Sequence, residues 1–120
     1  MNILNAFDFY SYKAIVVSVY DGDSVTLDID LGLGVWKKGQ KIRLLGIDAP
    51  EMRGEERDEG LISKARVVDL ILNKEVVVQT KKTGKYGRWL GTIWFLDEEN
   101  GWRNLNNLLV SEGLAEVYVK

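Results

Sequence analysis

The sequence predicts a mainly β domain of the α+β class, in which five short strands form a closed or partly closed Greek-key barrel that carries two helices. Its 120 residues are 46% hydrophobic and 28% charged, which suits one soluble globular domain with a single core. Runs of β-branched residues bounded by turn residues recur along both halves of the chain. Helical spacing of apolar residues is confined to two segments, the longer one after the third strand. We therefore predict one domain over residues 1–120, in which residues 1–12 are an N-terminal extension.

The first two predicted strands are joined by a tight turn. Residues 13–20 are rich in valine, and residues 24–31 alternate apolar with polar side chains. Between them, Asp21-Gly22 predicts a two-residue hairpin turn, because glycine readily adopts the positive φ that a type I′ turn requires. Asp23 would then be the first residue of the second strand.

The third predicted strand leads to the longer helix. Residues 32–39 are interpreted as a turn or β-arm that returns the chain into a strand over residues 40–47. A charged loop over residues 50–60 follows. We predict a helix over residues 60–72 with Asn73 as its C-cap, because apolar side chains recur at helical spacing at Leu61, Ala65, Val68 and Leu72.

The second half of the chain supplies the remaining elements. They are, in order, strands over residues 75–80 and 88–96 joined by a basic loop, a turn at Asn100-Gly101, a shorter helix over residues 105–112 with Gly113 as its C-cap, and a short last strand over residues 114–119. Five main strands with a helix after the third favour an oligonucleotide-binding (OB) barrel. An SH3-like barrel or a small α+β sheet also suits five strands, so the pattern alone leaves these alternatives open.

The composition restricts the chemistry that the chain can perform. It contains neither histidine nor cysteine. These absences exclude a Ser-His-Asp triad, a histidine-zinc site, thiolate metal sites and disulfides. Any acid-base catalysis must therefore use carboxylates, lysine or tyrosine.

Charge is unevenly distributed along the chain. The net charge of −2 argues mildly against a nucleic-acid-binding protein, for which a basic surface is usual. However, residues 36–43 and residues 81–88 each carry four basic residues and no acidic one. Two such patches can attract phosphates locally, since fields between exposed charges decay within about 10 Å in salt. The alternative interpretation is two solvated turns that are rich in lysine.

The sequence shows no signal for a membrane or for secretion. No stretch approaches the roughly 18 apolar residues that a membrane span requires. Residues 1–8 lack both a basic region and a long apolar region, so we expect no secretory signal here. We therefore expect a cytoplasmic or virus-encoded monomer without membrane contact, or a secreted protein if a signal is missing from this sequence.

The segment of residues 42–51 ends an apolar strand in an unusual way. Asp48 and Glu51 follow the strand on either side of Pro50, the single proline of the chain, and Arg43 lies within the apolar run. Packing alone does not favour this pattern, because an unpaired buried charge is costly. It predicts a site where oxygen ligands or bases lie beside a cation, as phosphate chemistry requires.

Further residues elsewhere in the chain complete this candidate site. Carboxylates at Asp23 and Asp48, with a backbone carbonyl and water, form a hard-oxygen set that suits Ca²⁺ or Mg²⁺. The planar guanidinium groups of Arg43 and Arg88 suit a phosphate. Asp21 is interpreted as a turn residue, because the segment that it starts lacks the glycine and the flanking helices of an EF-hand.

Four motifs, in this order and at about this spacing, resemble the staphylococcal nuclease (thermonuclease) family. They are Asp21-Gly22-Asp23-Ser24, Arg43-Leu44-Leu45-Gly46-Ile47-Asp48-Ala49-Pro50-Glu51, Lys85-Tyr86-Gly87-Arg88 and Glu112-Gly113-Leu114-Ala115. The resemblance covers residues 13–118 and implies a five-stranded OB barrel. It also implies a Ca²⁺-dependent phosphodiesterase that acts on DNA and RNA, with single-stranded or locally opened substrate favoured, and that releases the 5′ oxygen to leave 3′-phosphate ends.

The resemblance also implies a role for each matching residue. Asp23, Asp48 and the backbone carbonyl of Ala49 would hold Ca²⁺; Glu51 would be the general base or would position the attacking water; Arg43 and Arg88 would bind the scissile phosphate; Lys85, Tyr86 and Tyr118 would line the nucleotide pocket. Ala49 stands where the family often has threonine, which is tolerable if only the carbonyl binds metal. Gly84 replaces an acidic residue that is common before the Lys-Tyr-Gly-Arg motif.

The segment of residues 28–40 is longer than in the smallest relatives. It adds Trp36, Lys37 and Lys38, a basic and aromatic set that leads us to a hypothesis: this arm contacts nucleic acid beyond the scissile nucleotide. Unchanged DNA affinity and salt dependence in a Lys37→Ala/Lys38→Ala variant would contradict it. The alternative is an ordinary solvated hairpin.

Two further function classes compete with the nuclease. One is a non-catalytic barrel that binds nucleic acid or protein, and the other is a structural metal-binding domain. A degenerate, non-catalytic copy is expected to lose a carboxylate, the glutamate or an arginine. All five are present here at Asp23, Asp48, Glu51, Arg43 and Arg88, which favours the enzyme, and a structural metal site has little use for the arginines.

Overall fold

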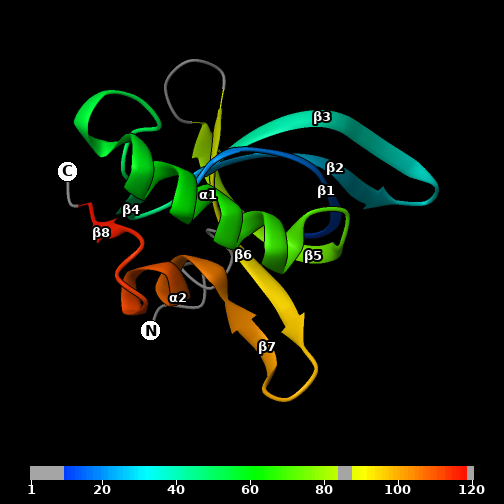
Figure 1. Cartoon of the computed structure of the whole chain (residues 1–120). Helices are drawn as coiled ribbons and strands as arrows, with labels where there is room; N and C mark the ends of the chain where they lie inside the picture. Colours follow the sequence, from blue (N-terminus) through cyan, green and yellow to red (C-terminus); the bar gives the residue numbers. More distant parts are fainter. Residues whose placement is uncertain (1–9, 84–87, 119–120) are drawn as a thin grey trace, which may run out of the picture.

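The computed structural model describes residues 10–83 and 88–118 of the chain. Within these residues, the fold is mainly β with two α-helices, as predicted (Figure 1). The strands are β1 (Tyr10–Asp21), β2 (Ser24–Gly32), β3 (Val35–Leu44), β4 (Ile47–Asp48), β5 (Glu75–Thr83), β6 (Trp89–Asp97), β7 (Gly101–Asn104) and β8 (Glu116–Val117). A 3₁₀ turn, η2 (Gly54–Glu56), precedes α1 (Arg57–Ile71), and α2 is Leu105–Ser111. No helix of these two ranges has the length and apolar character to cross a membrane.

Five strands form a closed ring. The hydrogen-bonded order is β3-β2-β1-β5-β6, and β3 pairs in turn with β6, which closes the sheet on itself. This last pairing is parallel, whereas β1 pairs antiparallel with both β2 and β5. The ring is therefore the five-stranded barrel of the OB type that the sequence predicted, and it removes the exposed edges of an open sheet.

Glycine at position 91 permits the ring to close. Leu44 of β3 lies opposite Gly91 of β6 in the parallel pairing. A Cβ atom at Gly91 would lie 3.1 Å from Ile42 Cγ2 and 3.2 Å from Val78 Cγ2, tighter than most side-chain contacts. The absence of a side chain therefore lets three strands approach closely at this point.

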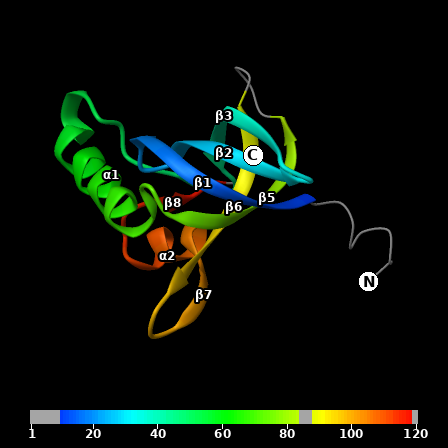
Figure 2. The same cartoon turned by 90° about the vertical axis from the view of Figure 1, so that its right-hand side faces the viewer.

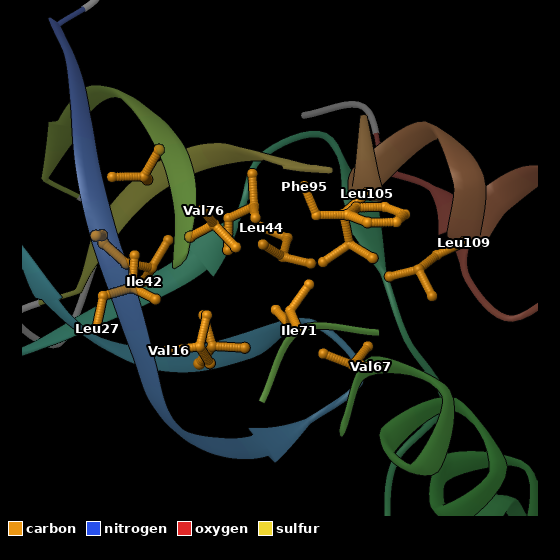
Figure 3. Packing of buried hydrophobic residues seen from close by; sticks show 14 of the residues in the cluster. Val16, Leu27, Ile42, Leu44, Val67, Ile71, Val76, Phe95, Leu105 and Leu109 are labelled. Carbon is orange, nitrogen blue, oxygen red and sulfur yellow. The ribbon is translucent and has the colours of Figure 1, made fainter. Parts of the chain in front are cut away.

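A single hydrophobic core fills the barrel and continues beneath both helices. The labelled side chains of Figure 3, each at most 4% exposed, are Val16, Leu27, Ile42, Leu44, Val67, Ile71, Val76, Phe95, Leu105 and Leu109. They come from four barrel strands and from both helices, so the helices and the barrel share one core. Burial of each such side chain stabilises the fold by about 1.5–3 kcal/mol.

The helices end as their sequences predicted. In α1 the C-cap is Leu72, and Asn73 follows with a positive φ of 62°. In α2 the C-cap is Glu112, and Gly113 follows with a φ of 74°. Each predicted cap residue thus lies one position beyond the C-cap, where the left-handed conformation stops a helix.

The turn between β1 and β2 differs from the prediction. Asp21 pairs with Ser24, so the two turn residues are Gly22 and Asp23, and Gly22 has no positive φ. Asp23 therefore lies in the turn rather than at the start of the second strand. Glycine is required here for space: a Cβ atom at Gly22 would lie 2.7 Å from Ser63 Cβ and 2.9 Å from Ala49 Cβ.

Several element boundaries also differ. Residues 10–12 were assigned to the N-terminal extension but belong to β1, because Tyr10 pairs with Thr80 of β5. β7, which pairs with β6, was not predicted, and β8 has two residues rather than six. The predicted third strand ends early at Leu44, since Gly46 turns the chain with a φ of 79°. Figure 2 shows α1 along one side of the strands and β7 extending with β6 away from the barrel.

The predicted arm is a long two-stranded hairpin made of β2 and β3 (Figure 1). Its tip is a turn at Leu33 and Gly34, which have φ values of 56° and 77°. Trp36 of the arm is 42% exposed. Near the base of the arm, the Lys37 ammonium lies 5.6 Å from the centroid of the Trp89 ring.

Candidate functional site

Asp23 is fixed by the β1–β2 turn and by the segment that follows β4. It is 6% exposed. Its carboxylate accepts hydrogen bonds from the Ala49 N–H at Oδ2 (2.8 Å) and from the Ser24 hydroxyl at Oδ1 (3.1 Å). Its backbone carbonyl accepts the Leu44 N–H at 2.8 Å. The close approach of Gly22 to Ala49 holds these two segments together.

Arg43 joins the two carboxylates predicted to hold metal. Its Nη1 lies 3.2 Å from Asp23 Oδ2, and its Nη2 lies 3.2 Å from Asp48 Oδ1. Nη1 also donates to the carbonyl of Ile47 at 2.9 Å. The Asp23 side chain is 8% exposed and the Asp48 side chain 59% exposed, so one ligand lies inside and the other at the surface. The structure therefore brings Asp23, Asp48, Ala49 and Arg43 together.

Asp21 is a third acidic side chain at this point of the fold. Burial, followed by the nearby Asp23 carboxylate, raises the pKa of Asp21 to about 6. Its Oδ1 accepts the Asp23 N–H at 3.0 Å. The raised pKa shows that negative charge is crowded here, an environment that favours binding of a cation.

Glu51 lies on the loop that follows this cluster, and α1 fixes the backbone of that loop. Gly60 of α1 lies directly against it: a Cβ atom there would overlap the Glu51 carbonyl and lie 2.9 Å from the carbonyl of Pro50. The Glu51 N–H donates to Glu56 Oε2 at 3.2 Å. The Glu51 residue is exposed, so its carboxylate is accessible to solvent.

A small acidic pocket lies on the Glu51 side of the cluster. It has a volume of about 170 Å³, and Ala49 and Pro50 form part of its wall. All of the charged residues that line it are acidic: Asp48, Glu51, Glu56, Glu59 and Glu116. Two proposed functional residues, Asp48 and Glu51, thus share this pocket.

Arg88 lines a different and larger depression, which we call the basic groove. The basic groove has a volume of about 440 Å³ and runs over parts of β1, β2 and β3, with Met52 and the α1 residue Lys64 at its sides. Ser24, which donates to Asp23, and Met52, which follows Glu51, both line it. Arg88 is therefore placed next to the cluster by shared walls, while no contact between Arg88 and the two metal-ligand candidates is described.

The three proposed nucleotide-pocket residues have different outcomes. Lys85 and Tyr86 lie outside the described residues. Tyr118 is 51% exposed, and its N–H donates to the carbonyl of Gly46 at 2.8 Å. This bond continues the β4–β8 pairing, in which Asp48 lies opposite Glu116. Tyr118 thus lies beside the connection that carries Asp48.

The donor set at this site suits a hard divalent cation. Two carboxylates from separate segments converge on one guanidinium, which shows that both can face a single positive group. Within the described ranges, however, no three side chains of acidic or other ligating type are arranged to hold a metal ion. Because Ca²⁺ takes six to eight oxygen ligands, a cation here would complete its coordination with a backbone carbonyl and water.

The fold and the site together define a small OB-type barrel with an acidic and arginine-bearing cluster at the end of β3. The chain belongs to the staphylococcal nuclease family, because the family model described as "Staphylococcal nuclease homologue" matches residues 41–120. That match contains Arg43, Asp48, Ala49, Glu51 and Arg88. Asp23 lies before it, so the structure rather than the family match connects Asp23 with the rest.

Proteins that resemble the chain carry related names. It is 33% identical over 107 residues to "Protein ParB" of Escherichia coli and 30% identical over 111 residues to "Micrococcal nuclease" of Shigella flexneri. It is also 35% identical over 103 residues to an "Uncharacterized endonuclease" of Escherichia coli O157:H7. These alignments cover 86%, 89% and 86% of this chain but 55%, 59% and 59% of the relatives, so the chain spans little more than half of their length.

Sequence reasoning missed two positioning residues near the site. Gly60 gave no signal, because a glycine at the predicted start of a helix is interpreted as a boundary. Asn106 of α2 is 3% exposed, donates to the carbonyls of Leu45 (2.9 Å) and Gly91 (3.2 Å), and accepts the Ile93 N–H (3.2 Å). It thereby joins α2 to the strand ends that lead to Asp48. A buried amide among the apolar positions of a short helix was the available signal.

Proposed function

We propose that this domain is a Ca²⁺-dependent nuclease that hydrolyses phosphodiester bonds of DNA and RNA, with single-stranded or locally opened substrate favoured, and that it acts as a monomer. The observation that carries the proposal is the cluster of Asp23, Arg43 and Asp48, in which two carboxylates contact one guanidinium at 3.2 Å. Membership of the staphylococcal nuclease family and relatives named as nucleases support it.

Asp23 and Asp48, with the carbonyl of Ala49, would hold the Ca²⁺. When bound, the cation supplies positive charge beside the phosphate and can orient or acidify water. The Ala49 N–H bond to Asp23 supports this assignment, since it holds the backbone of residue 49 next to the inner carboxylate. The replacement of threonine by alanine at this position leaves the carbonyl in place.

The arginines are assigned to the phosphate. Hydrolysis adds negative charge to an anionic phosphorus centre, so preorganised cations stabilise the transition state. Arg43 is anchored by Asp23, Asp48 and the carbonyl of Ile47, which limits its loss of side-chain entropy when substrate binds. Arg88 would approach the same phosphate from the basic groove.

Glu51 is assigned to the attacking water. The water oxygen forms a bond to phosphorus, its proton passes to the Glu51 carboxylate, and the bond from phosphorus to the 5′ oxygen breaks. The departing oxygen takes a proton from solvent, which leaves a 3′-phosphate end and a 5′-hydroxyl end. The exposed Glu51 residue and its place beside Asp48 and Ala49 in the acidic pocket support this role.

The test compares cleavage of denatured DNA by three proteins in millimolar Ca²⁺: the native protein, Glu51→Gln, and Glu55→Gln as a control. Glu55 is an exposed residue of η2 in the same loop, so the control makes the same change of charge. We expect Glu51→Gln to lower the rate by about 10²- to 10⁴-fold, because general acid-base catalysis contributes that much, while Glu55→Gln cleaves at the native rate. End-group analysis should find 3′-phosphates.

Equal rates for the native protein and Glu51→Gln would overturn the role of Glu51. Native protein that binds single-stranded DNA but does not cleave it in Ca²⁺ would favour the alternative, a non-catalytic barrel that binds nucleic acid.

A further inference from the structure

The basic groove carries a distinctive set of charges. Lys41 of β3, Lys64 of α1 and Arg88 before β6 are the charged residues that line it, and all three are basic. They come from distant parts of the chain and were not a cluster in the sequence. Among the described residues, neither Lys41 nor Lys64 forms an ion pair with an acidic side chain. The positive charge of these lysines is therefore available to an anionic ligand.

The size and remaining lining of the basic groove suit a nucleotide chain. Its volume of about 440 Å³ lies within the range of ligand sites. Tyr20, which is 72% exposed, lies at its edge, and Val19 and Met52 add apolar surface. Basic side chains that follow a phosphate backbone, together with an aromatic face on which a base can stack, are typical of single-strand binding.

The basic groove is continuous with the candidate catalytic cluster. Ser24 belongs to its wall and donates to the Asp23 carboxylate at 3.1 Å. Ile42 of the wall precedes Arg43, and Met52 follows Glu51. A strand whose scissile phosphate lies at Arg43 therefore has a direct route into the basic groove. The acidic pocket on the Glu51 side, with five carboxylates, would repel the same backbone.

We propose that the basic groove holds the sugar-phosphate backbone of single-stranded nucleic acid on one side of the bond to be cleaved, with Lys41 and Lys64 as phosphate-binding residues and Tyr20 as a stacking surface. This inference rests on the proposed function, because it identifies where the substrate of that same site extends. It assigns to Lys41, Lys64 and Tyr20 a role in substrate binding, and none in the chemical step.

The experiment measures binding of a fluorescent single strand of about 12 nucleotides, within the site sizes of OB barrels, by anisotropy in Ca²⁺ at several salt concentrations. All proteins carry Glu51→Gln so that the strand stays intact. The groove variant is Lys41→Gln/Lys64→Gln. The control is Lys13→Gln/Lys74→Gln, which removes the same charge at two exposed lysines outside the basic groove.

The groove variant is expected to bind about 20-fold more weakly near 0.1 M salt, and the slope of log affinity against log salt should fall by about 1.4, since each phosphate contact to a single strand contributes about 0.7. The control should change affinity by about twofold or less, because exposed charges distant from the ligand are screened. Lys41→Arg/Lys64→Arg should restore the slope, which distinguishes lost phosphate contacts from a damaged fold.

The outcome also separates this inference from the proposed function. If the groove variant and the control bind alike, or if the parent protein does not bind the strand, the inference is wrong. With Glu51 restored, the groove variant should cleave a dinucleotide at the native rate and a longer strand with a raised KM. Groove-dependent binding by a native protein that cleaves nothing would support the inference and refute the nuclease.

Discussion

At Arg43, one guanidinium neutralises two carboxylates that differ greatly in exposure. Both contacts are 3.2 Å long, but the Asp23 side chain is 8% exposed and the Asp48 side chain 59%. Loss of a buried, hydrogen-bonded carboxylate leaves its partners unsatisfied, whereas an exposed ion pair contributes little to stability. The two aspartates should therefore have the same effect on Ca²⁺ binding and different effects on folding.

We predict that Asp23→Asn and Asp48→Asn each abolish the rise in Tm that Ca²⁺ gives the native protein, because a ligand stabilises only the state that binds it. Without Ca²⁺, Asp23→Asn should lower the free energy of unfolding by about 1–3 kcal/mol, and Asp48→Asn by about 0.5 kcal/mol or less. Urea and thermal unfolding with and without Ca²⁺ measure both. A full Ca²⁺-induced rise in either variant would contradict the assignment, and Glu55→Gln is the control.

Gly60 positions Glu51 by leaving space for its backbone. A Cβ atom at residue 60 would lie 2.9 Å from the Pro50 carbonyl and would overlap the carbonyl of Glu51. We predict that Gly60→Ala lowers the cleavage rate by at least about tenfold, since small displacements of catalytic groups are costly, although alanine favours helix. Leu61→Ala, a change at an exposed neighbour, should retain the native rate. Native cleavage by Gly60→Ala would show that Glu51 needs no such support.

Residue types and positions in the sequence identified the acidic cluster, but not its contacts. Asp23, Arg43 and Asp48 were correctly expected to meet, since their strand ends were expected to be neighbours. The pairing of Arg43 with both carboxylates depends on the turn at Gly46, which separates β3 from β4 and brings Asp48 back toward β3. The turn at Gly22 was wrongly expected to require a positive φ, because a close contact with Ala49 cannot be inferred from local sequence.

Among the secondary-structure elements, α1 and α2 are joined by a two-point ion pair. Arg66 donates from Nε to Glu112 Oε1 at 2.8 Å and from Nη2 to Glu112 Oε2 at 2.9 Å. Nearby, the Ser63 hydroxyl donates to the carbonyl of Leu114 at 2.6 Å. These contacts connect the helix that supports Glu51 with the segment that leads into β8, the partner strand of β4.

This ion pair makes stability depend on pH. The Arg66 hydrogen bonds lower the pKa of Glu112 in the folded state, so its contribution is present above the ordinary glutamate pKa and is lost as pH falls through the lower folded value. We predict that Glu112→Gln costs about 0.5–1 kcal/mol at pH 7, reduced by solvent exposure of both side chains. In urea unfolding, this difference from the native protein should vanish in acid.

Glu75→Gln provides the control for this measurement, because Glu75 is exposed and forms no ion pair with the described residues. A constant cost of Glu112→Gln across the acid range would mean that the charge of Glu112 contributes nothing to stability.

The elements that sequence predicted well are those with a strong period. The five barrel strands and α1 alternate or repeat clearly, and each was expected near its observed place. β7 was missed because residues 101–104 are a short glycine-led segment without alternation, and its strand character depends on pairing with β6. The early start of α1 was missed because the first turns are highly charged rather than amphipathic.

For the whole molecule, the sequence gives a net charge of −2, yet the folded surface separates the two signs. The basic groove and the acidic pocket lie on different sides of the Arg43 cluster. The predicted basic windows contributed only Lys41 and Arg88 to the groove, because Lys64 reaches it from the longer helix. The prediction that the arm residues Lys37 and Lys38 contact nucleic acid stays a prediction, with Lys37 held against Trp89.

The account as a whole depends on one claim, that this domain cleaves phosphodiester bonds only with a divalent cation at Asp23 and Asp48. The most direct test follows the initial rate of cleavage of denatured DNA by the native protein in millimolar Ca²⁺, after addition of a chelator, and after Ca²⁺ is restored in excess. We predict cleavage, its loss, and its recovery. Absence of cleavage in Ca²⁺, or undiminished cleavage in the chelator, would contradict the claim.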